Sequence, residues 1–485
     1  MNLPLTNGVN MSVWKNILNN LPEVAGPTQK RLSFKEKLKW TLIILIIFYI
    51  LGLLPLFGLG QNSLQRFEFL SIILAAQFGS LISLGIGPIV TASIVLQLLN
   101  GAGILKFDLT ESEGKRAFQG TQKLLSIFFI IFEACIYVFL GGLAPPNQFA
   151  GTPFYFQLEL LLVFQLFIGG TLILFMDEVV SKWGFGSGIS LFIAAGVSQE
   201  IVVRTFSWLP SPTNPGIATG AIPAFFQSLA AGDPRTAGLM IAGVLSTIVI
   251  FVISVYVQAM KVEIPLSFGR IRGHGIRWPL SFVYTSNIPV ILIAALLANI
   301  QLWARLFENW AVSSGNSVIN FISVYILGQT NTVNSGHGIV QWVNPPDIVG
   351  SLIRGSFTLS QFKVAILYMC IMILGSIMFS IFWVQTSGMD ARSQAKQMMN
   401  TGLQIPGFRR DERVLERLLN RYIWPLTVMG AIVIGFLASF ADLTGALSRG
   451  TGILLTVMII YRLYEDIARQ HMMDMNPMMR KFVGG

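Results

Sequence analysis

The sequence has little charge, little cysteine and little histidine, and each shortage excludes a class of protein. Charged residues are 12% of the 485 residues, roughly half the ~25% of an average soluble domain and too few to cover a water-soluble particle of this size. Two cysteines, Cys135 and Cys370, both lie in apolar runs and cannot form a disulfide framework. Three scattered histidines have no cysteine partners for zinc, so we expect no metal and no cofactor.

Long apolar stretches take the place of those residues. A helix needs about 20 mostly apolar residues to cross the ~30 Å hydrocarbon layer of a bilayer. Stretches of this length without alternation predict helices and not barrel strands, because helices satisfy their own backbone hydrogen bonds in lipid. The sequence therefore predicts an all-α polytopic membrane protein with ten spans, at residues 38–57, 79–100, 121–142, 154–176, 185–205, 238–260, 282–303, 361–386, 423–441 and 450–467.

The basic residues are divided unevenly between the two predicted sides. With the N-terminus placed inside, 26 of the 33 lysines and arginines fall on inner segments and seven on outer segments. This satisfies the positive-inside rule, so we expect both termini on the cytoplasmic side of the cell membrane. The N-terminus shows no short leader with a cleavage site. Residues 11–39 look amphipathic and basic, which predicts an interfacial helix.

Residues 60–78 predict a segment that enters the membrane without crossing it. They are too short to span and carry Arg66 and Glu68, yet their apolar end is too hydrophobic for a hydrated loop. A half-depth helix on the outer side fits both properties. Non-spanning backbone at membrane depth needs protein or a water-filled cavity around it, so we expect a cavity open to the outside.

Two glycine-led motifs resemble each other across the chain. Gly186-Ser-Gly188-Ile-Ser-Leu191 opens the fifth span and Gly450-Thr-Gly452-Ile-Leu-Leu455 opens the tenth. Five spans per half is an odd number, so the second half would be inverted relative to the first. Inverted repeats place a functional site near the midplane, between the halves. A match this short can also arise by chance in a chain with 46 glycines.

Acidic residues are rare inside the predicted spans. Glu133 is the one carboxylate well inside a span, while Asp177 and Glu178 end the fourth span, where water reaches them easily. An intramembrane carboxylate tends to be functional, although Glu133 could also be a buried acid that pairs with a polar neighbour for helix packing. The sequence shows no phosphate-binding loop, no paired carboxylates and no nucleophile with a partner histidine. We therefore expect no enzymatic activity, and a driving force that comes from elsewhere.

Several longer motifs, in order, are similar to a known family. The resemblance is to archaeal members of the SecY family, the central (alpha) subunit of the Sec protein translocon, and it runs from about residue 14 to the end of the tenth span. The motifs that carry it are Phe34-Lys-Glu-Lys-Leu-Lys-Trp40, Leu84-Gly-Ile-Gly-Pro-Ile-Val-Thr91, Phe118-Gln-Gly-Thr-Gln-Lys-Leu124, Gly188-Ile-Ser-Leu-Phe-Ile-Ala-Ala-Gly196, Ser286-Asn-Ile-Pro-Val-Ile291, Gly407-Phe-Arg-Arg410 and Tyr422-Ile-Trp-Pro-Leu-Thr427.

The resemblance implies a passive protein-conducting channel. Unfolded secretory polypeptides would pass through a pore between two inverted five-helix halves, and hydrophobic segments would leave sideways into lipid through a lateral gate. The implied divisions are a cytoplasmic N-terminal interfacial segment, an N-terminal half, a C-terminal half with inner loops 261–281 and 387–421, and a cytoplasmic tail, at residues 1–37, 38–237, 238–467 and 468–485 respectively.

The resemblance also assigns a pore ring and a plug. Branched aliphatic pairs four residues apart share a helix face, which by periodicity alone is ordinary packing. The family's apolar ring carries onto such pairs and two further residues: Ile86, Val90, Ile189, Ile193, Ile291 and Leu437. An aliphatic constriction blocks ions by dewetting. The plug would be residues 60–72, with Gln61, Asn62, Gln65, Arg66, Phe67, Glu68 and Phe69.

Gln77 departs from the family pattern, because many members carry arginine at this position, just before the second span. This departure leaves open how tightly the plug is held. The resemblance places the lateral gate between spans 2–3 and 7–8, with Thr91, Glu133 and Asn299 as its polar residues. Glu133 stands where other branches have glutamine. A protonated Glu133 would behave as the amide does, and this is the form we expect.

The resemblance implies that basic residues on the two large inner loops dock a ribosome, where arginine would bind the phosphates of RNA; their number alone is also explained by the positive-inside rule. They are Arg270, Arg272, Arg277, Arg409 and Arg410. The implied partners are SecE (gamma), a small beta subunit, the ribosome with its nascent polypeptide and signal sequence, and membrane lipid. An inverted-repeat secondary transporter for a small solute is the alternative. It would explain the spans and the symmetry, but it needs ion-coordinating groups that this interior lacks.

Overall fold

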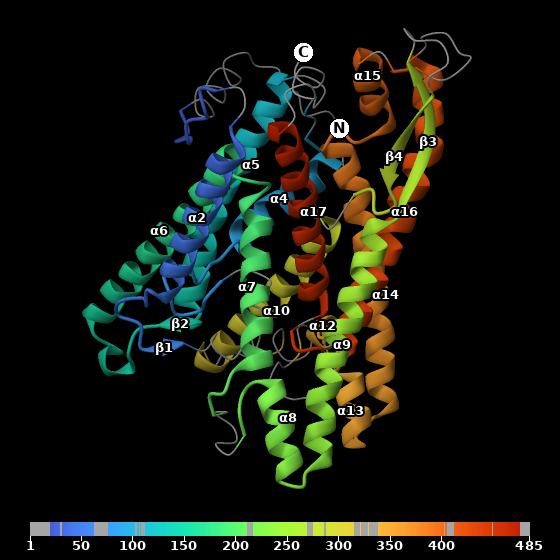
Figure 1. The fold of residues 1–485 in the computed structure, drawn as a ribbon. Coiled ribbons are helices and arrows are strands. Elements are labelled where there is room, and N and C mark those ends of the chain that lie inside the picture. The colour runs from blue at the N-terminus through green and yellow to red at the C-terminus, as the bar shows by residue number, and fades with distance from the viewer. Residues whose placement is uncertain are drawn as a thin grey trace.

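The computed structural model describes residues 20–29, 32–62, 76–101, 104–105, 107, 112–210, 217–268, 275–285, 288–314, 321, 328, 338–401, 403–404, 412–448 and 450–475. Figure 1 shows a bundle of long helices with a small sheet at one end. The helices are α2 (Phe34–Leu53), α4 (Gly87–Gly101), α5 (Ser112–Phe139), α6 (Pro153–Trp183), α7 (Gly188–Phe206), α8 (Ala221–Ala230), α9 (Pro234–Ala259), α10 (Ile288–Ser314), α12 (Ile339–Val343), α13 (Ile348–Arg354), α14 (Leu359–Thr386), α15 (Ala391–Thr401), α16 (Glu412–Leu443) and α17 (Gly450–Met475).

Each of the ten predicted spans falls on one of these helices, which confirms the all-α membrane class. Among the described residues, seven helices are long and apolar enough to cross a bilayer: α5, α6, α7, α9, α10, α14 and α16. Of the other three, α4 is shorter, and α2 and α17 carry charged residues at one end. Several helices run past the predicted spans, because their polar turns continue the helix beyond the apolar stretch.

The second span begins later than predicted. Residues 81–86 form turns, and α4 starts only at Gly87. Gly79 and Gly85 adopt left-handed φ angles of 96° and 57°, a conformation that glycine tolerates and a helix does not. The Ser83 hydroxyl donates to the carbonyl of Ser80 at 2.5 Å and so stabilises the turns. As a result, Ile86 lies immediately before α4 instead of about two turns inside the predicted span.

The two predicted inner loops form one packed unit at the end of the bundle. Within 261–281, the described residues form β3 (Lys261–Phe268) and β4 (Gly275–Ser281), which pair antiparallel. Strand β5 (Leu403–Gln404) pairs with the end of β3. Ile264 is fully buried and packs with Leu280 against apolar side chains of α15 and α16. An all-α expectation for these loops was therefore incomplete.

Residues 20–29 are not helical, so the predicted interfacial helix over 11–39 is wrong for this segment; residues 11–19 lie outside the described part. Pro22 and Pro27 disfavour a helix here. The segment lies along the ends of α5 and α6 instead. The Val24 N–H donates to Glu178 at 3.0 Å, and the Trp183 indole N–H donates to the Ala25 carbonyl at 2.9 Å.

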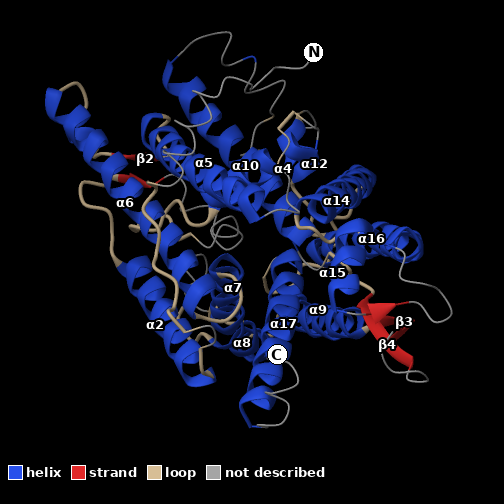
Figure 2. Cartoon of the chain, turned by 90° about the horizontal axis from the view of Figure 1, so that it is seen from above, coloured by secondary structure: helices blue, strands red, loops and turns tan. Residues whose placement is uncertain are grey.

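The bundle has two groups of helices that meet in the middle. Figure 2 shows α2, α5 and α6 on one side and α14 and α16 on the other, with α4, α7, α10 and α17 between them. The two sides meet through these central helices: α7 packs on α17, and α4 packs on α10 and α14. The largest apolar cluster contains side chains from both groups, so the core of the molecule is also the boundary between its halves.

Candidate functional site

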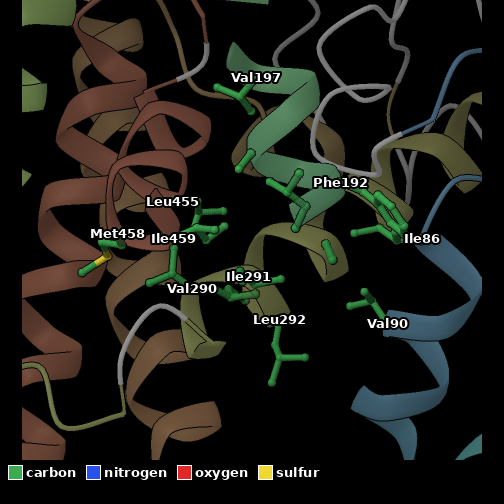
Figure 3. Close-up of a cluster of buried hydrophobic side chains, with 14 of the residues drawn as sticks. Ile86, Val90, Phe192, Val197, Val290, Ile291, Leu292, Leu455, Met458 and Ile459 are labelled. Carbon is green, nitrogen blue, oxygen red and sulfur yellow. The ribbon is translucent and has the colours of Figure 1, made fainter. Parts of the chain in front are cut away.

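All six predicted ring residues lie in this central apolar cluster. Ile86, Val90, Ile193, Ile291 and Leu437 are buried, and Ile189 is partly buried and packs on them. They come from the start of α4, from α7, from α10 and from α16. Figure 3 shows Ile86 and Val90 gathered with Ile291 in this cluster. Because the residues are far apart in the sequence, the tertiary fold alone brings these aliphatic groups together.

Helix α17 contributes a residue that the sequence prediction omitted. Leu455 is buried in the same cluster, and Figure 3 shows it beside Ile459 on the side of Ile291 away from Val90. Leu437, which the sequence analysis predicted in addition to Ile291 from the second half, lies on the preceding helix α16. A signal for Leu455 was present, since it ends the glycine-led motif that matches the start of α7.

The three predicted gate residues are joined by hydrogen bonds. The Asn299 side-chain N–H donates to Thr91 Oγ1 at 2.8 Å, and Thr91 Oγ1 lies 3.1 Å from Glu133 Oε1. Thr91 Oγ1 also lies 2.8 Å from the Gly87 carbonyl. Glu133 is fully buried. One polar cluster therefore links α4, α5 and α10 inside an otherwise apolar seam.

A second contact closes the seam between α4 and α14. Gly101, at the end of α4, lies so close to Phe382 that a Cβ there would approach the ring Cδ1 to 2.4 Å. Farther along α14, a Cβ on Gly375 would lie 2.4 Å from Ile293 Cδ1. Glycine allows such close approach of two helices because it has no side chain. The Gly375 contact joins α14 to α10 on one side of the seam. The seam itself is held by polar bonds at one level and by the contact of Gly101 with Phe382 at another.

Most of the predicted plug and docking residues lie outside the described part of the chain. Gln61 and Asn62 form β1, which pairs with β2 (Leu143–Ala144). Arg277 lies on β4, opposite Pro265 in β3. The other members fall outside the described residues: Gln65, Arg66, Phe67, Glu68, Phe69, Arg270, Arg272, Arg409 and Arg410.

Two further observations bear on the plug and on cofactors. Gln77, where the sequence departs from the family pattern, lies in the described part of the chain. Its side chain packs against Gly52 of α2, where a Cβ would lie 2.5 Å from Gln77 Oε1. Within the described ranges, no group of three or more histidine, cysteine or acidic side chains could hold a metal ion.

Comparison with known proteins agrees with this geometry. The SecY family matches residues 80–464. Protein translocase subunit SecY of Methanothermobacter thermautotrophicus is 45% identical over 468 residues, covering 96% of this chain and 97% of that protein. A solved protein-conducting channel is 41% identical with a TM-score of 0.77. A Sec61 channel from the canine ribosome–channel complex of the endoplasmic reticulum is 40% identical with a TM-score of 0.75; both structures cover 94% of this chain, and it covers 97% of each. The chain therefore belongs to the SecY family.

Proposed function

We propose that this protein is a protein-conducting channel whose resting state is sealed by the central aliphatic cluster. The observation that carries the proposal is that Ile86, Val90, Ile193 and Ile291 meet in one buried cluster between the two halves. Leu455 belongs to the same cluster from α17, so we add it to the ring. Leu437 stays a predicted member.

An aliphatic ring suits a channel for many different polypeptides. Branched aliphatic side chains disfavour a continuous file of water, so the ring excludes ions when no polypeptide is present. They also form no directional bond with a passing side chain, and conduction requires weak binding inside the pore. The residues therefore seal the channel without selecting a sequence.

The seam of α4 and α5 against α10 and α14 is the proposed lateral gate. Its polar contacts, between Thr91, Glu133 and Asn299, are interhelical hydrogen bonds, which contribute about 0.6–2 kcal/mol each inside a membrane. A hydrophobic segment that enters the seam replaces these bonds with apolar contacts. The strength of the cluster therefore sets how hydrophobic a segment must be to open the gate.

The assembly around the channel is proposed from the family. SecE and a small beta subunit would pack on the lipid side of the halves, and both termini would face the cytoplasm at the cell membrane. Residues 60–72 would plug the outer side of the ring. The unit of β3, β4, β5, α15 and α16 would present the docking arginines, including Arg277 on β4, to ribosomal RNA. A Sec61 relative with the same fold was solved in a ribosome–channel complex.

Ion leakage tests the seal directly. The variants Ile86→Gly and Ile189→Gly, reconstituted in vesicles with the partner subunits, should leak small ions at rest, because each removes aliphatic bulk from the ring. Ile248→Gly is the control, since it makes the same substitution on α9, where Ile248 lies outside the ring with 53% of its surface exposed. Its loss of helix propensity is at least as large as that of the ring variants, because Ile86 precedes α4 and Ile189 lies in the first turn of α7. Vesicles that stay sealed with the ring variants, but lose uptake of a small solute, would contradict the channel and indicate a transporter.

A further inference from the structure

Two aspartates occupy matching positions at the ends of the helices that precede α7 and α17. Asp177, near the end of α6, accepts the Ile189 backbone N–H at 3.0 Å and the Ser187 hydroxyl at 3.4 Å, both on Oδ1. Asp442, near the end of α16, accepts the Thr451 backbone N–H on Oδ1 at 2.8 Å. Each carboxylate therefore satisfies a free amide at the start of the next helix, and Asp177 does not simply face water as the sequence predicted.

The hydroxyl bonds at the two positions also correspond. Ser187 and Thr451 are the middle residues of the two glycine-led motifs. Each donates its hydroxyl to the aspartate of the preceding helix. Ser187 stands at the N-cap of α7 but makes no cap bond to its own helix. The start of α7 is therefore attached to a neighbouring helix instead of being capped by its own N-cap side chain, as is usual. The start of α17 makes the same kind of bond to the helix that precedes it.

Close packing of glycine accompanies each aspartate. A Cβ on Gly188 would lie 2.7 Å from Asp177 Cα, and a Cβ on Gly450 would lie 2.1 Å from the carbonyl carbon of Ala441, the neighbour of Asp442. Neither position can hold a side chain without displacing backbone. Gly188 and Gly450 are the first residues of α7 and α17, but in the motifs Gly188 matches Gly452 and not Gly450. The motif positions that do correspond in the structure are the hydroxyl donors, Ser187 and Thr451.

Both attached helices carry ring residues. Ile189, whose amide bonds to Asp177, is itself a ring residue, and Ile193 follows one turn later. On α17, Leu455 lies one turn after Thr451. Helices α7 and α17 pack on each other and run in opposite directions (Figure 1), so the two attachments lie at opposite ends of this pair.

We propose that Asp177 and Asp442 are paired positioning residues that fix the height and rotation of α7 and α17, and thereby keep the ring closed at rest. The inference rests on the proposed sealing role of the ring. Asp442 has an additional effect, because it accepts the Tyr368 hydroxyl at 2.6 Å. Tyr368 lies on α14. This bond therefore couples α16, a helix of the ring, to α14, a helix of the proposed lateral gate.

Hydrogen exchange measures the attachment without depending on the seal. In the complex in nanodiscs, Asp177→Ala should accelerate amide exchange at the start of α7, and Asp442→Ala at the start of α17, by about tenfold for a lost hydrogen bond. Asp177→Asn keeps the accepting oxygen and should exchange like the wild type. Asp442→Asn keeps one oxygen for Thr451 but loses an acceptor for the hydroxyls, so it should be intermediate.

Ion leakage of the same variants tests the consequence. Both alanine variants should leak at rest, whereas Asp177→Asn should stay sealed. Asp233→Ala is the control: Asp233 caps α9 through the amides of Arg235 and Thr236, so local exchange should rise without a leak. If the alanine variants do not assemble, Gly188→Ala is the substitute. Its added methyl group displaces the junction between α6 and α7 but keeps the Asp177 carboxylate.

The outcomes separate this proposal from that of the ring. Unchanged exchange, or faster exchange without leakage while Ile86→Gly leaks, would overturn the positioning role alone. If no variant leaks, Ile86→Gly included, both the ring and its positioning residues are wrong. Local exchange and leakage together in the alanine variants, with rescue by Asp177→Asn, supports both.

Discussion

Thr91 has one hydroxyl proton and two acceptors within reach. Its Oγ1 lies 2.8 Å from the Gly87 carbonyl and 3.1 Å from Glu133 Oε1, and it already accepts from Asn299. A hydroxyl can donate once and accept twice. If Glu133 is protonated, it donates to Thr91, and Thr91 donates to the Gly87 carbonyl. The one donor and both acceptor positions of the Thr91 hydroxyl are then used. An ionised Glu133 would compete with the carbonyl for one proton.

This count predicts that Glu133→Gln preserves the gate, since the amide N–H replaces the carboxyl O–H as the donor to Thr91. Glu133→Leu removes the donor and should lower the free energy of gate opening by about 0.6–2 kcal/mol, the contribution of one membrane hydrogen bond. The measurement is insertion of marginally hydrophobic segments, which Glu133→Leu should admit more readily.

Infrared spectroscopy at neutral pH checks the protonation state. A carboxylic acid band should be present in the wild type and absent from Glu133→Gln. A spectrum in which this residue contributes only carboxylate bands would show that the gate contains a charge, and the hydrogen-bond count above would be wrong.

Residue types could be assigned from sequence, whereas their partners could not. The resemblance assigned Thr91, Glu133 and Asn299 to one seam, and the structure joins them. It gave Ile291 and Leu437 for the second half but did not reveal Leu455, because Leu437 and Leu455 are both leucines in apolar spans and periodicity does not say which helix faces the centre. Asp177 looked solvated, since its acceptor role depends on where the next helix begins.

Helix α4 approaches α14 closely enough to exclude any side chain at Gly101. A Cβ at this position would lie 2.4 Å from Phe382 Cδ1, so Gly101→Ala must either displace the Phe382 side chain or separate α4 from α14. Overpacking of this kind costs about 1–3 kcal/mol. Since the strain is relieved when the seam opens, Gly101→Ala should lower the hydrophobicity that a segment needs for insertion.

The control for this prediction is Gly196→Ala on α7. A Cβ there has no atom within 4 Å, so the substitution adds a methyl group in the interior of a helix and changes its propensity without a clash. The measurement is crosslinking of a signal segment to α4, which reports how readily the segment enters the gate in each variant. Equal changes in both variants would mean that propensity, and not the contact with Phe382, is responsible.

At the element scale, hydrophobic length predicted the ten spans but not their ends. The start of α4 depends on the left-handed glycines Gly79 and Gly85, which an apolar average over the window conceals. The hairpin β3–β4 had a local signal in the alternation of Val262 and Ile264 with charged residues. Its packing against α15 and α16 had none, because those helices follow more than 100 residues later.

The two halves are joined differently on opposite sides of the molecule. On one side α7 packs on α17; the Ser448 hydroxyl donates to Glu200 at 2.5 Å, and Arg204 donates to the Leu447 carbonyl at 3.3 Å. On the other side α4 meets α10 and α14 (Figure 2). The first junction combines extensive packing with charged bonds, and the second has a small polar cluster and one glycine contact, between Gly101 and Phe382. Opening should therefore separate the α4 side while the α7–α17 side acts as the hinge.

Matched disulfides at the two junctions test this arrangement. Gly101 with Phe382 bridges the gate side. Gly452 with Val197 bridges the hinge side, where a Cβ on the glycine would lie 3.3 Å from Val197 Cγ2. Each pair becomes two cysteines in a chain whose native Cys135 and Cys370 are replaced by serine. The gate disulfide should abolish insertion and translocation, with recovery on reduction, because α4 can no longer leave α14.

The hinge disulfide should leave both activities within about twofold of the reduced protein, since a hinge rotates without separating its contacts. Formation of each disulfide is verified by a mobility shift, so an inactive variant is distinguished from an uncrosslinked one. The opposite result, with activity lost at Gly452 and Val197 but retained at Gly101 and Phe382, would place the opening motion between α7 and α17. The polar cluster around Thr91 would then lie at the hinge, and its bonds would contribute to holding the halves together instead of setting the threshold for opening.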